Sequence, residues 1–197
     1  MKAIHVPYRV RRTLVWMRRW RRTRGFGVHS PTDYHFIRYV INQHWPYYAY
    51  DTLKNERPDI DKKTRKVCKL YFRLANWLQP AETVLCQMPS TAYAQYIQAG
   101  CNQTHITDVD DTDNTPQAQL CAMTLNEETM PLIQQTLQQA DDGTMIVING
   151  IHRSRKNKKY WRQLRKQHNA TLTFDVYYCG IILIRHKRTK QHYIVNY

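Results

Sequence analysis

The chain has 197 residues, of which 42% are apolar, and carries 30 Lys and Arg against 15 Asp and Glu, a formal net charge of +15. This length and apolar content indicate one globular domain with its own core. They exclude a fully disordered chain, a collagen, a disulfide scaffold and a multi-span membrane protein. A basic enzyme, a nucleic-acid binder and a membrane-surface protein all remain compatible with the composition.

The N-terminal segment is predicted to be a basic amphipathic helix. Within Tyr8–Arg24, the apolar residues Val10, Leu14 and Met17 recur at helical spacing, and no acidic residue precedes Asp33. In one interpretation the apolar stripe packs on the domain and the arginines lie in water. In the other, the helix lies on nucleic acid or an anionic membrane surface.

A turn rich in glycine follows and leads into further helices. Ser30 is the expected N-cap, and Pro31 suits the first helical position. The helix itself is expected over Thr32–Gln43. The aromatic segment Trp45–Pro58 is predicted to be irregular. A long amphipathic helix is expected over Lys62–Leu78.

Strands and helices alternate from residue 83 onward. The expected strands are Thr83–Gln87, Thr104–Val109, Gln119–Leu125, Thr144–Asn149, Thr171–Tyr177, Gly180–His186 and His192–Asn196. The expected helices are Thr91–Ala99, closed by Gly100, then Met130–Gln139 and Ser154–Gln167. This order predicts an α/β fold with a mostly parallel sheet and antiparallel strands near the C-terminus. We divide it into a basic N-terminal helical arm, residues 1–61, and an α/β domain, residues 62–197.

The charges are segregated along the chain. Residues 1–81 carry 18 basic and five acidic residues, residues 82–150 carry nine acidic and no Lys or Arg, and residues 151–197 carry 12 basic residues and one acid. Either this is solvated surface, or the basic ends meet and bind an anionic polymer. The candidate anion-binding residues are Arg18, Arg19, Arg21, Arg22, Arg155, Lys156 and Lys159.

Cysteine and histidine usage argues against a disulfide framework and a metal site. The five cysteines and nine histidines are scattered and show no ligand spacing. We therefore expect buried thiols, a cytoplasmic location and no bound metal. No segment approaches the roughly 20 apolar residues of a membrane span.

Several stretches, taken in order, resemble the class I S-adenosylmethionine-dependent methyltransferases. They are Arg22–Pro31 (RTRGFGVHSP), Val147–Ser154 (VINGIHRS), Tyr160–Leu164 (YWRQL), Thr173–Leu183 (TFDVYYCGIIL) and Lys190–Tyr197 (KQHYIVNY). The resemblance implies a Rossmann-like fold, S-adenosylmethionine as cofactor and a small-molecule substrate. The segment between the second strand and Met130 is short for that family's third and fourth strands.

The chain departs from this family where the cofactor binds. After the first strand the family has an acid, a glycine and, after three residues, another glycine; here these positions are Cys86, Met88 and Ala92. Met88 would occupy the place of the cofactor's methionine part, and Pro89 removes a backbone donor. The resemblance thus assigns Cys86 and Met88 to the cofactor site by position, without the usual chemistry.

Other site positions are partly kept. The acid that holds the ribose hydroxyls in the family matches Asp110, with Asp108 as the alternative. The family's Asp-Asp pair, which serves metal binding or acid–base chemistry, is replaced by Asn149-Gly150. His152 is the remaining candidate acid or base; alternatively, it is a loop histidine bonded to backbone.

Three functions follow from these observations. The chain is an active methyltransferase with an unusual cofactor loop, a degenerate methyltransferase kept as a binding or partner module, or a basic module that binds nucleic acid, an anionic membrane surface or a protein partner. We expect a methyltransferase fold with an unknown substrate and impaired or lost catalysis.

Overall fold

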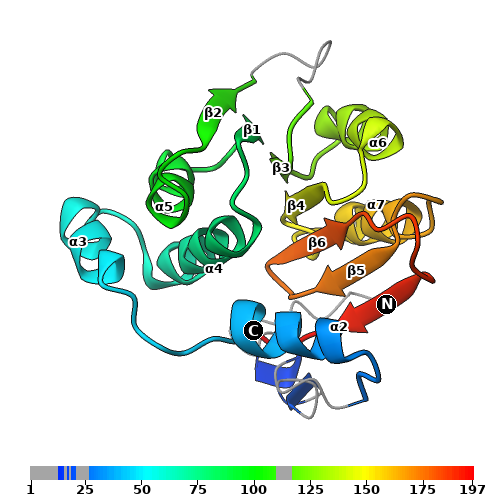
Figure 1. Ribbon diagram of the computed structural model, residues 1–197, viewed down its shortest axis with the longest axis horizontal. Coiled ribbons are helices and arrows are strands. Elements are labelled where there is room, and N and C mark those ends of the chain that lie inside the picture. Colours follow the sequence, from blue (N-terminus) through cyan, green and yellow to red (C-terminus); the bar gives the residue numbers. More distant parts are fainter. Residues whose placement is uncertain (1–12, 16, 18, 21–26, 110–116) are drawn as a thin grey trace, which may run out of the picture.

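The structure is a computed structural model that describes residues 13–15, 17, 19–20, 27–109 and 117–197 (Figure 1). Its centre is a seven-stranded sheet in the order β2-β1-β3-β4-β6-β5-β7. The strands are β1 Glu82–Cys86, β2 His105–Asp108, β3 Leu120–Thr124, β4 Met145–Asn149, β5 Leu172–Asp175, β6 Cys179–Leu183 and β7 Gln191–Ile194.

Most neighbouring strands run parallel. Strands β1 to β4 pair parallel to one another, β6 runs antiparallel to both β4 and β5, and β7 pairs parallel with β5. The predicted Rossmann-like sheet, mostly parallel with antiparallel pairing near the C-terminus, is confirmed. Between β2 and α6, the described residues form one strand, β3, in keeping with the shortness of this segment.

Helices cover both faces of the sheet. They are α2 Pro31–Phe36, the π-helix η2 Ile37–Ile41, α3 Ala49–Glu56, α4 Lys62–Leu78, α5 Ala92–Gly100, α6 Thr129–Gln139 and α7 Arg155–Leu164. Figure 1 shows α4 and α5 on one side of the sheet and α6 and α7 on the other.

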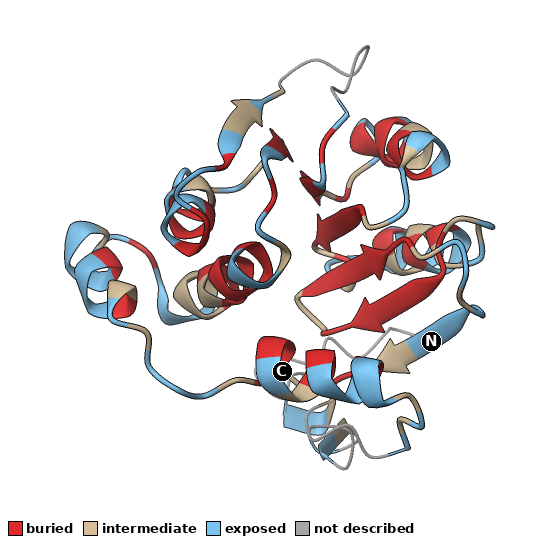
Figure 2. Ribbon diagram, in the orientation of Figure 1, coloured by how far each residue is buried: buried red, intermediate tan, exposed pale blue. Residues whose placement is uncertain are grey.

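The core forms two apolar clusters, one on each face of the sheet. Because successive strand residues point to opposite faces, Val147 of β4 packs with α4 and α5, whereas Ile146 and Ile148 pack with α6 and α7. Figure 2 shows β4, β5 and β6 buried along their length. A strand buried on both faces has a continuous apolar sequence, which is why β4 was recognisable in the chain.

The helix over Lys62–Leu78 has the predicted bounds. Asp61 caps its N-terminus, since its Oδ1 accepts hydrogen bonds from the amides of Lys63 and Thr64 at 2.6 and 3.0 Å. Gln79, with φ 49°, ends the helix in the left-handed region.

Gly100 has a different role from the predicted one. It is the last residue of α5 and does not adopt a positive φ, so it is not a left-handed cap. A Cβ placed on it would lie 2.3 Å from the carbonyl oxygen of Phe72 in α4. Glycine is required because the two helices approach closely here.

The segment Trp45–Pro58 was wrongly predicted to be irregular, because it contains α3. Only Tyr50 and Leu53 of this helix are buried, so its apolar periodicity is too short to stand out in the sequence. The predicted helix over Thr32–Gln43 is present. It begins at Pro31, the residue expected at the first helical position, changes to a π-helix at Ile37 and ends at Ile41.

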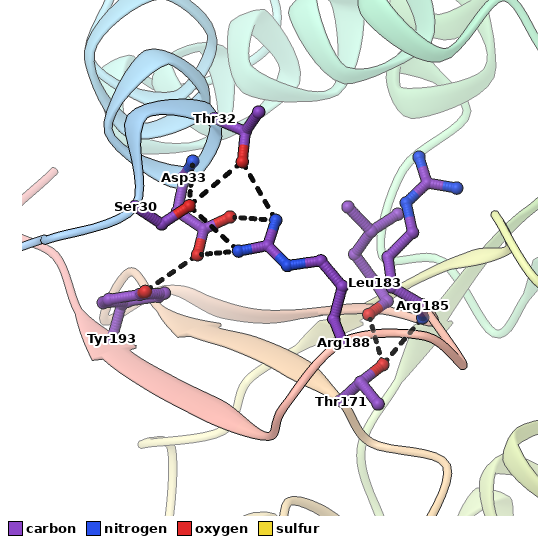
Figure 3. A network of polar contacts seen from close by, with 8 residues as sticks. All are labelled: Ser30, Thr32, Asp33, Thr171, Leu183, Arg185, Arg188 and Tyr193. Carbon is purple, nitrogen blue, oxygen red and sulfur yellow. Dashed lines mark hydrogen bonds and ion pairs between the residues drawn. The ribbon is translucent and has the colours of Figure 1, made fainter.

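A polar cluster around Asp33 joins α2 to the C-terminal part of the chain (Figure 3). The Asp33 carboxylate, in a residue only 3% exposed, accepts two bonds from Arg188 at 3.0 Å and one from the Tyr193 hydroxyl at 2.8 Å. Arg188 also donates to Ser30 Oγ and Thr32 Oγ1, each at 2.9 Å. Ser30 therefore both caps α2, as predicted, and anchors it to the sheet side.

The boundary at residue 61 stays a prediction. Phe36 and Ile37, N-terminal to it, share one apolar cluster with Leu70 and Phe174.

All five cysteines are buried, and none of them forms a disulfide. Of the predicted helix over Tyr8–Arg24, the described residues 13–15, 17 and 19 are helical. In the described part of the chain, no helix has the length and apolar character to cross a membrane.

Candidate functional site

The loops after β1, β3 and β4 meet at the carboxyl edge of the sheet. The chain goes from β1 to β2 on one side and then crosses to β3 on the other side of β1. The strand order therefore reverses between β1 and β3. In open α/β sheets, ligands bind in the crevice outside the carboxyl ends of the strands at such a point.

Side chains bridge this crevice. Gln87 follows β1 with φ 49°, and its Oε1 accepts a hydrogen bond from Asn126 Nδ2, in the loop after β3, at 2.6 Å. Gln87 Nε2 lies 3.4 Å from Glu128 Oε2 in the same loop. The loops after β1 and β3 are thus tied together across the switch point.

Met88 and Cys86 do not offer polar groups to a ligand here. Met88 packs against the core, with its Sδ 3.7 Å from Asn149 Nδ2 at the end of β4. Cys86 is 1% exposed and lies in the apolar cluster with α6 and α7. The thiol at the position of the family's acid is therefore buried in the core.

The described residues at this crevice do not fit S-adenosylmethionine. The glycines that would admit the cofactor are absent, Pro89 has no N–H, and the Gln87–Asn126 bond crosses the opening. Asp110, the predicted ribose-binding residue, lies outside the described residues, and its neighbour Asp108 ends β2.

A cavity of about 460 Å³ opens beside the crevice. Its lining comes from the first turns of α4, the loop after β1, the ends of β3 and β4, and the turn between β5 and β6; the residues are Lys63, Thr64, Val67, Pro89, Tyr93, Thr124, Asn149, Gly150, His152, Arg153, Tyr177 and Tyr178. No residue of β2 lines it, so it lies on the β4 side of the switch point.

His152 lines this cavity, and the buried carboxylate of Asp175 lies behind it. His152 Nε2 lies 2.7 Å from Asp175 Oδ2, and Arg19 Nη1 donates to Asp175 Oδ1 at 2.8 Å. Arg19 Nη2 is also 3.4 Å from His152 Nε2. Burial opposes ionisation of the carboxyl, but the hydrogen bond and charge of His152, with those of Arg19, outweigh it and hold the pKa of Asp175 well below its usual range.

Tyr177 holds this pair in place from the β5–β6 turn. Its φ of 72° is left-handed, which is costly for a non-glycine residue, and its amide donates to Asp175 Oδ1 at 3.0 Å. Its ring stacks on His152 with centroids 5.5 Å apart and an interplanar angle of 16°. The guanidinium of Arg19 lies 5.6 Å from the centre of the same ring.

Asp175 and Tyr177 together orient the imidazole ring of His152. An ionised carboxylate can only accept, so in neutral His152 the Nε2–H donates to Asp175 and Nδ1 is left as an acceptor. A carboxylate that fixes the tautomer is the usual partner of a histidine base. His152 is thus bonded to a side chain rather than to backbone, and its role as acid or base stays a prediction.

The structure assigns the candidate anion-binding residues to different places. Arg19 is engaged by Asp175, and Lys156 forms an ion pair with Glu127. Arg155 and Lys159 are exposed on α7. Arg18, Arg21 and Arg22 lie outside the described residues.

Sequence reasoning missed Asp175 as a site residue, and it weighed Tyr177 as a pocket residue against simple packing. One signal pointed to Asp175: it is the only acid among 12 basic residues in the segment 151–197. Groups of three or more His, Cys, Asp or Glu that could hold a metal ion are absent from the described residues.

Comparison with known proteins supports the fold. No protein-family model matches the chain, and no curated protein matches it. Among solved structures, it is similar to the SAH-bound methyltransferase PaMTH1 of Podospora anserina, with a TM-score of 0.55 and 9% identity over 94% of this chain and 100% of that one. It is also similar to the cofactor-bound protein Rv0187 from MTB, with a TM-score of 0.49 and 10% identity over 75% of this chain and 93% of that one. The first likeness shows that the chain has a class I methyltransferase fold; at such identity it concerns the fold alone.

Proposed function

We propose that this chain is a methyltransferase-like protein that has lost methyl transfer from S-adenosylmethionine and binds an anionic small molecule in the carboxyl-edge cavity. One observation carries the first part: the side chains of Gln87 and Asn126 join the loops after β1 and β3 at 2.6 Å. In this fold class the cofactor would have to enter between those loops.

The residues around the Gln87–Asn126 hydrogen bond support the proposed loss of methyl transfer. Met88 lies against Asn149 at the end of β4, where the family's carboxylate pair begins, and neutral Asn149-Gly150 cannot supply that charge. Buried Cys86 cannot replace an acid that contacts a ligand. Several positions therefore differ together, at the ends of β1 and β4.

The lining of the carboxyl-edge cavity supports the proposed binding of an anionic small molecule. Lys63, His152 and Arg153 line it, and among the described residues no Asp or Glu does. Tyr93, Tyr177 and Tyr178 add aromatic side chains to the wall. Its volume lies within the usual range of small-molecule sites, roughly 300–1,000 Å³. A small anion with an aromatic part suits this lining.

Calorimetric titration with S-adenosylmethionine tests the loss. We expect no binding at cofactor concentrations up to about 1 mM, a limit set by the weak end of small-ligand affinities. Micromolar binding that disappears in Asp110→Ala and persists in the matched variant Asp108→Ala would overturn the proposal, because it would show a working ribose contact.

A second candidate function rests on the exposed face of α7. Arg155, Lys159, Arg162 and Lys166 recur at helical spacing along the helix and just beyond it, and all four are exposed, while Trp161 faces the core. The four side chains are exposed on one helix or just beyond it, whereas Arg19 of the N-terminal segment is already paired with Asp175. We propose it as a contact surface for a nucleic-acid backbone.

A further inference from the structure

A second cavity, of about 670 Å³, lies on another face of α4. Its walls are the end of η2, residues 43–47, the first turn of α3 and the last two residues of the chain. Lys66, Lys69 and Arg73 of α4 line it, and it shares no lining residue with the carboxyl-edge cavity. Neither the methyltransferase fold nor the proposed function accounts for it.

A buried guanidinium without a carboxylate partner lies in its wall. Arg73 is 4% exposed and donates to the carbonyl oxygens of Val40 and Ile41 at 2.7 and 2.9 Å. Its other bonds go to the hydroxyls of Tyr50 and Tyr197, each at 3.2 Å. Among the described residues it forms no ion pair, and one of the two Nη1 hydrogens has no acceptor. A buried positive charge with only neutral partners is costly unless an anion joins it.

Further positive charge faces the same space. Lys66, Lys69 and Arg73 are three and four residues apart, so they share one face of α4. Arg38 of η2 lines the opposite wall. Asp51 is the acidic side chain of the lining, and it is exposed, so four cations face one carboxylate.

An unpartnered donor belongs to the same wall. Asn196 is 4% exposed, and its Nδ2 has no hydrogen-bond partner among the described residues. A buried amide donor is expected to be satisfied, by protein or by a bound molecule. Asn196 lines the cavity, so a bound molecule that reaches this amide would supply the missing acceptor.

Aromatic side chains complete the cavity. Tyr47 and Tyr50 pack edge to face on Phe72, which fixes their rings, and Lys69 Nζ lies 4.4 Å from the centre of the Tyr50 ring. Trp45 lines the cavity and is 76% exposed. An exposed indole beside a cationic pocket is a surface on which a planar ring can stack.

We propose that this cavity binds a phosphorylated small molecule that carries a planar ring. The phosphate lies between Lys66, Lys69 and the open Nη1 hydrogen of Arg73, and accepts from Asn196 Nδ2. The ring lies against Trp45. Phosphate oxygens supply a negative charge to this cationic lining and several acceptors in one group.

Calorimetry with phenyl phosphate, inorganic phosphate and phenol tests this assignment. We expect phenyl phosphate to bind best, inorganic phosphate more weakly and phenol not at all. The double variant Lys66→Gln/Lys69→Gln should lower the affinity for phenyl phosphate at least about tenfold, since it removes two charge-assisted contacts. The matched variant Lys54→Gln/Lys62→Gln, which makes the same charge change on exposed lysines outside the lining, should bind like the wild type.

Two further variants distinguish phosphate binding in this cavity from binding in the carboxyl-edge cavity and from a loss of folding. Arg153→Gln, in the carboxyl-edge cavity, reports on phenyl phosphate bound there and should lower the measured affinity less than Lys66→Gln/Lys69→Gln does. Asn196→Leu keeps the branched shape and the number of side-chain heavy atoms, removes the amide donor, and should weaken binding without lowering Tm. The assignment is overturned if neither phosphate binds at millimolar concentration, or if Arg153→Gln or Lys54→Gln/Lys62→Gln lowers the affinity as much as the cavity variant. Equal affinities for phenyl phosphate and inorganic phosphate would overturn the role of the ring.

Discussion

Asp175 is the residue that holds His152 of the carboxyl-edge cavity. It ends β5, and the turn into β6 carries it toward His152 in the loop after β4. Its two carboxylate oxygens have different partners, His152 on one and Arg19 on the other. The His152–Asp175 pair therefore connects the sheet to Arg19 of the N-terminal segment, and it is also a candidate proton-transfer group.

Acid sensitivity follows from the lowered pKa of Asp175. An unfolded Asp has a pKa of about 3.9. Because the folded pKa is lower, the stabilising effect of the carboxylate is present above that value and is lost as the pH falls through it toward the folded pKa. We expect Asp175→Asn to lower the free energy of unfolding by about 2 kcal/mol at pH 7. It should also flatten the decline in stability between pH 5 and pH 2.

Urea unfolding across this pH range measures both effects. Asp51→Asn, which changes an exposed carboxylate on α3, should leave the pH profile as in the wild type. If Asp175→Asn and the wild type lose stability in parallel on acidification, the carboxylate does not contribute as described.

The sequence identified one member of this pair and not the other. His152 stood out by its place in a stretch that resembles a methyltransferase motif. Asp175 is 23 residues away, and only the antiparallel pairing of β5 and β6 brings the two together. A contact of this kind depends on strand pairing, which spacing along the chain does not encode.

At the scale of elements, the contact between α4 and α5 is closest at Gly100. The Phe72 carbonyl belongs to the backbone of α4 and cannot move aside as a side chain can. We expect Gly100→Ala to destabilise the protein by about 2–3 kcal/mol, even though alanine favours a helix, because the two helices must separate.

Thermal or urea unfolding checks this expectation. The control is Gln98→Ala, at an exposed position of the same helix, which we expect to stay within about 0.5 kcal/mol of the wild type. A Gly100→Ala variant as stable as the wild type would show that α5 can shift away from α4 at no cost.

The elements themselves were largely predictable, for different reasons. The bounds of α4 agree with the prediction because an Asp cap, a strong amphipathic face and a following proline act together. β4 was found because it is buried on both faces. α3 was missed because two buried residues give no usable period, and Gly100 was misread because a close approach of two helices leaves no local mark.

At the scale of the whole molecule, the acidic middle segment and the basic C-terminal segment carry their charges on different kinds of elements. In the acidic middle segment, neither α5 nor α6 contains a charged residue, and the described acids lie in strand ends and loops. In the basic C-terminal segment, five of the 12 basic residues lie on α7 and two more directly follow it. This concentration of charge is why we propose α7 as the contact surface for a polyanion.

Salt dependence tests the stripe on α7. If its four cations contact duplex phosphates, the logarithm of the binding constant should fall with the logarithm of salt concentration with a slope of about −3.6. Lys159→Gln/Arg162→Gln should make the slope shallower by about 2, whereas Lys54→Gln/Lys62→Gln should leave it unchanged. A slope near zero in the wild type, or equal slopes in both variants, argues against phosphate contacts on this helix.

The cluster around Asp33 has a consequence for the order in which the protein is completed during synthesis. Its carboxylate needs the guanidinium of Arg188, 155 residues later, and the hydroxyl of Tyr193. While the chain is still being made, Asp33 has no cation and α2 lacks these polar anchors to the C-terminal strands. The ribosome must release almost the whole chain before this helix can dock. A protein shortened by its last ten residues would therefore lack these contacts, and they would hold neither α2 near the N-terminus nor the C-terminal strands.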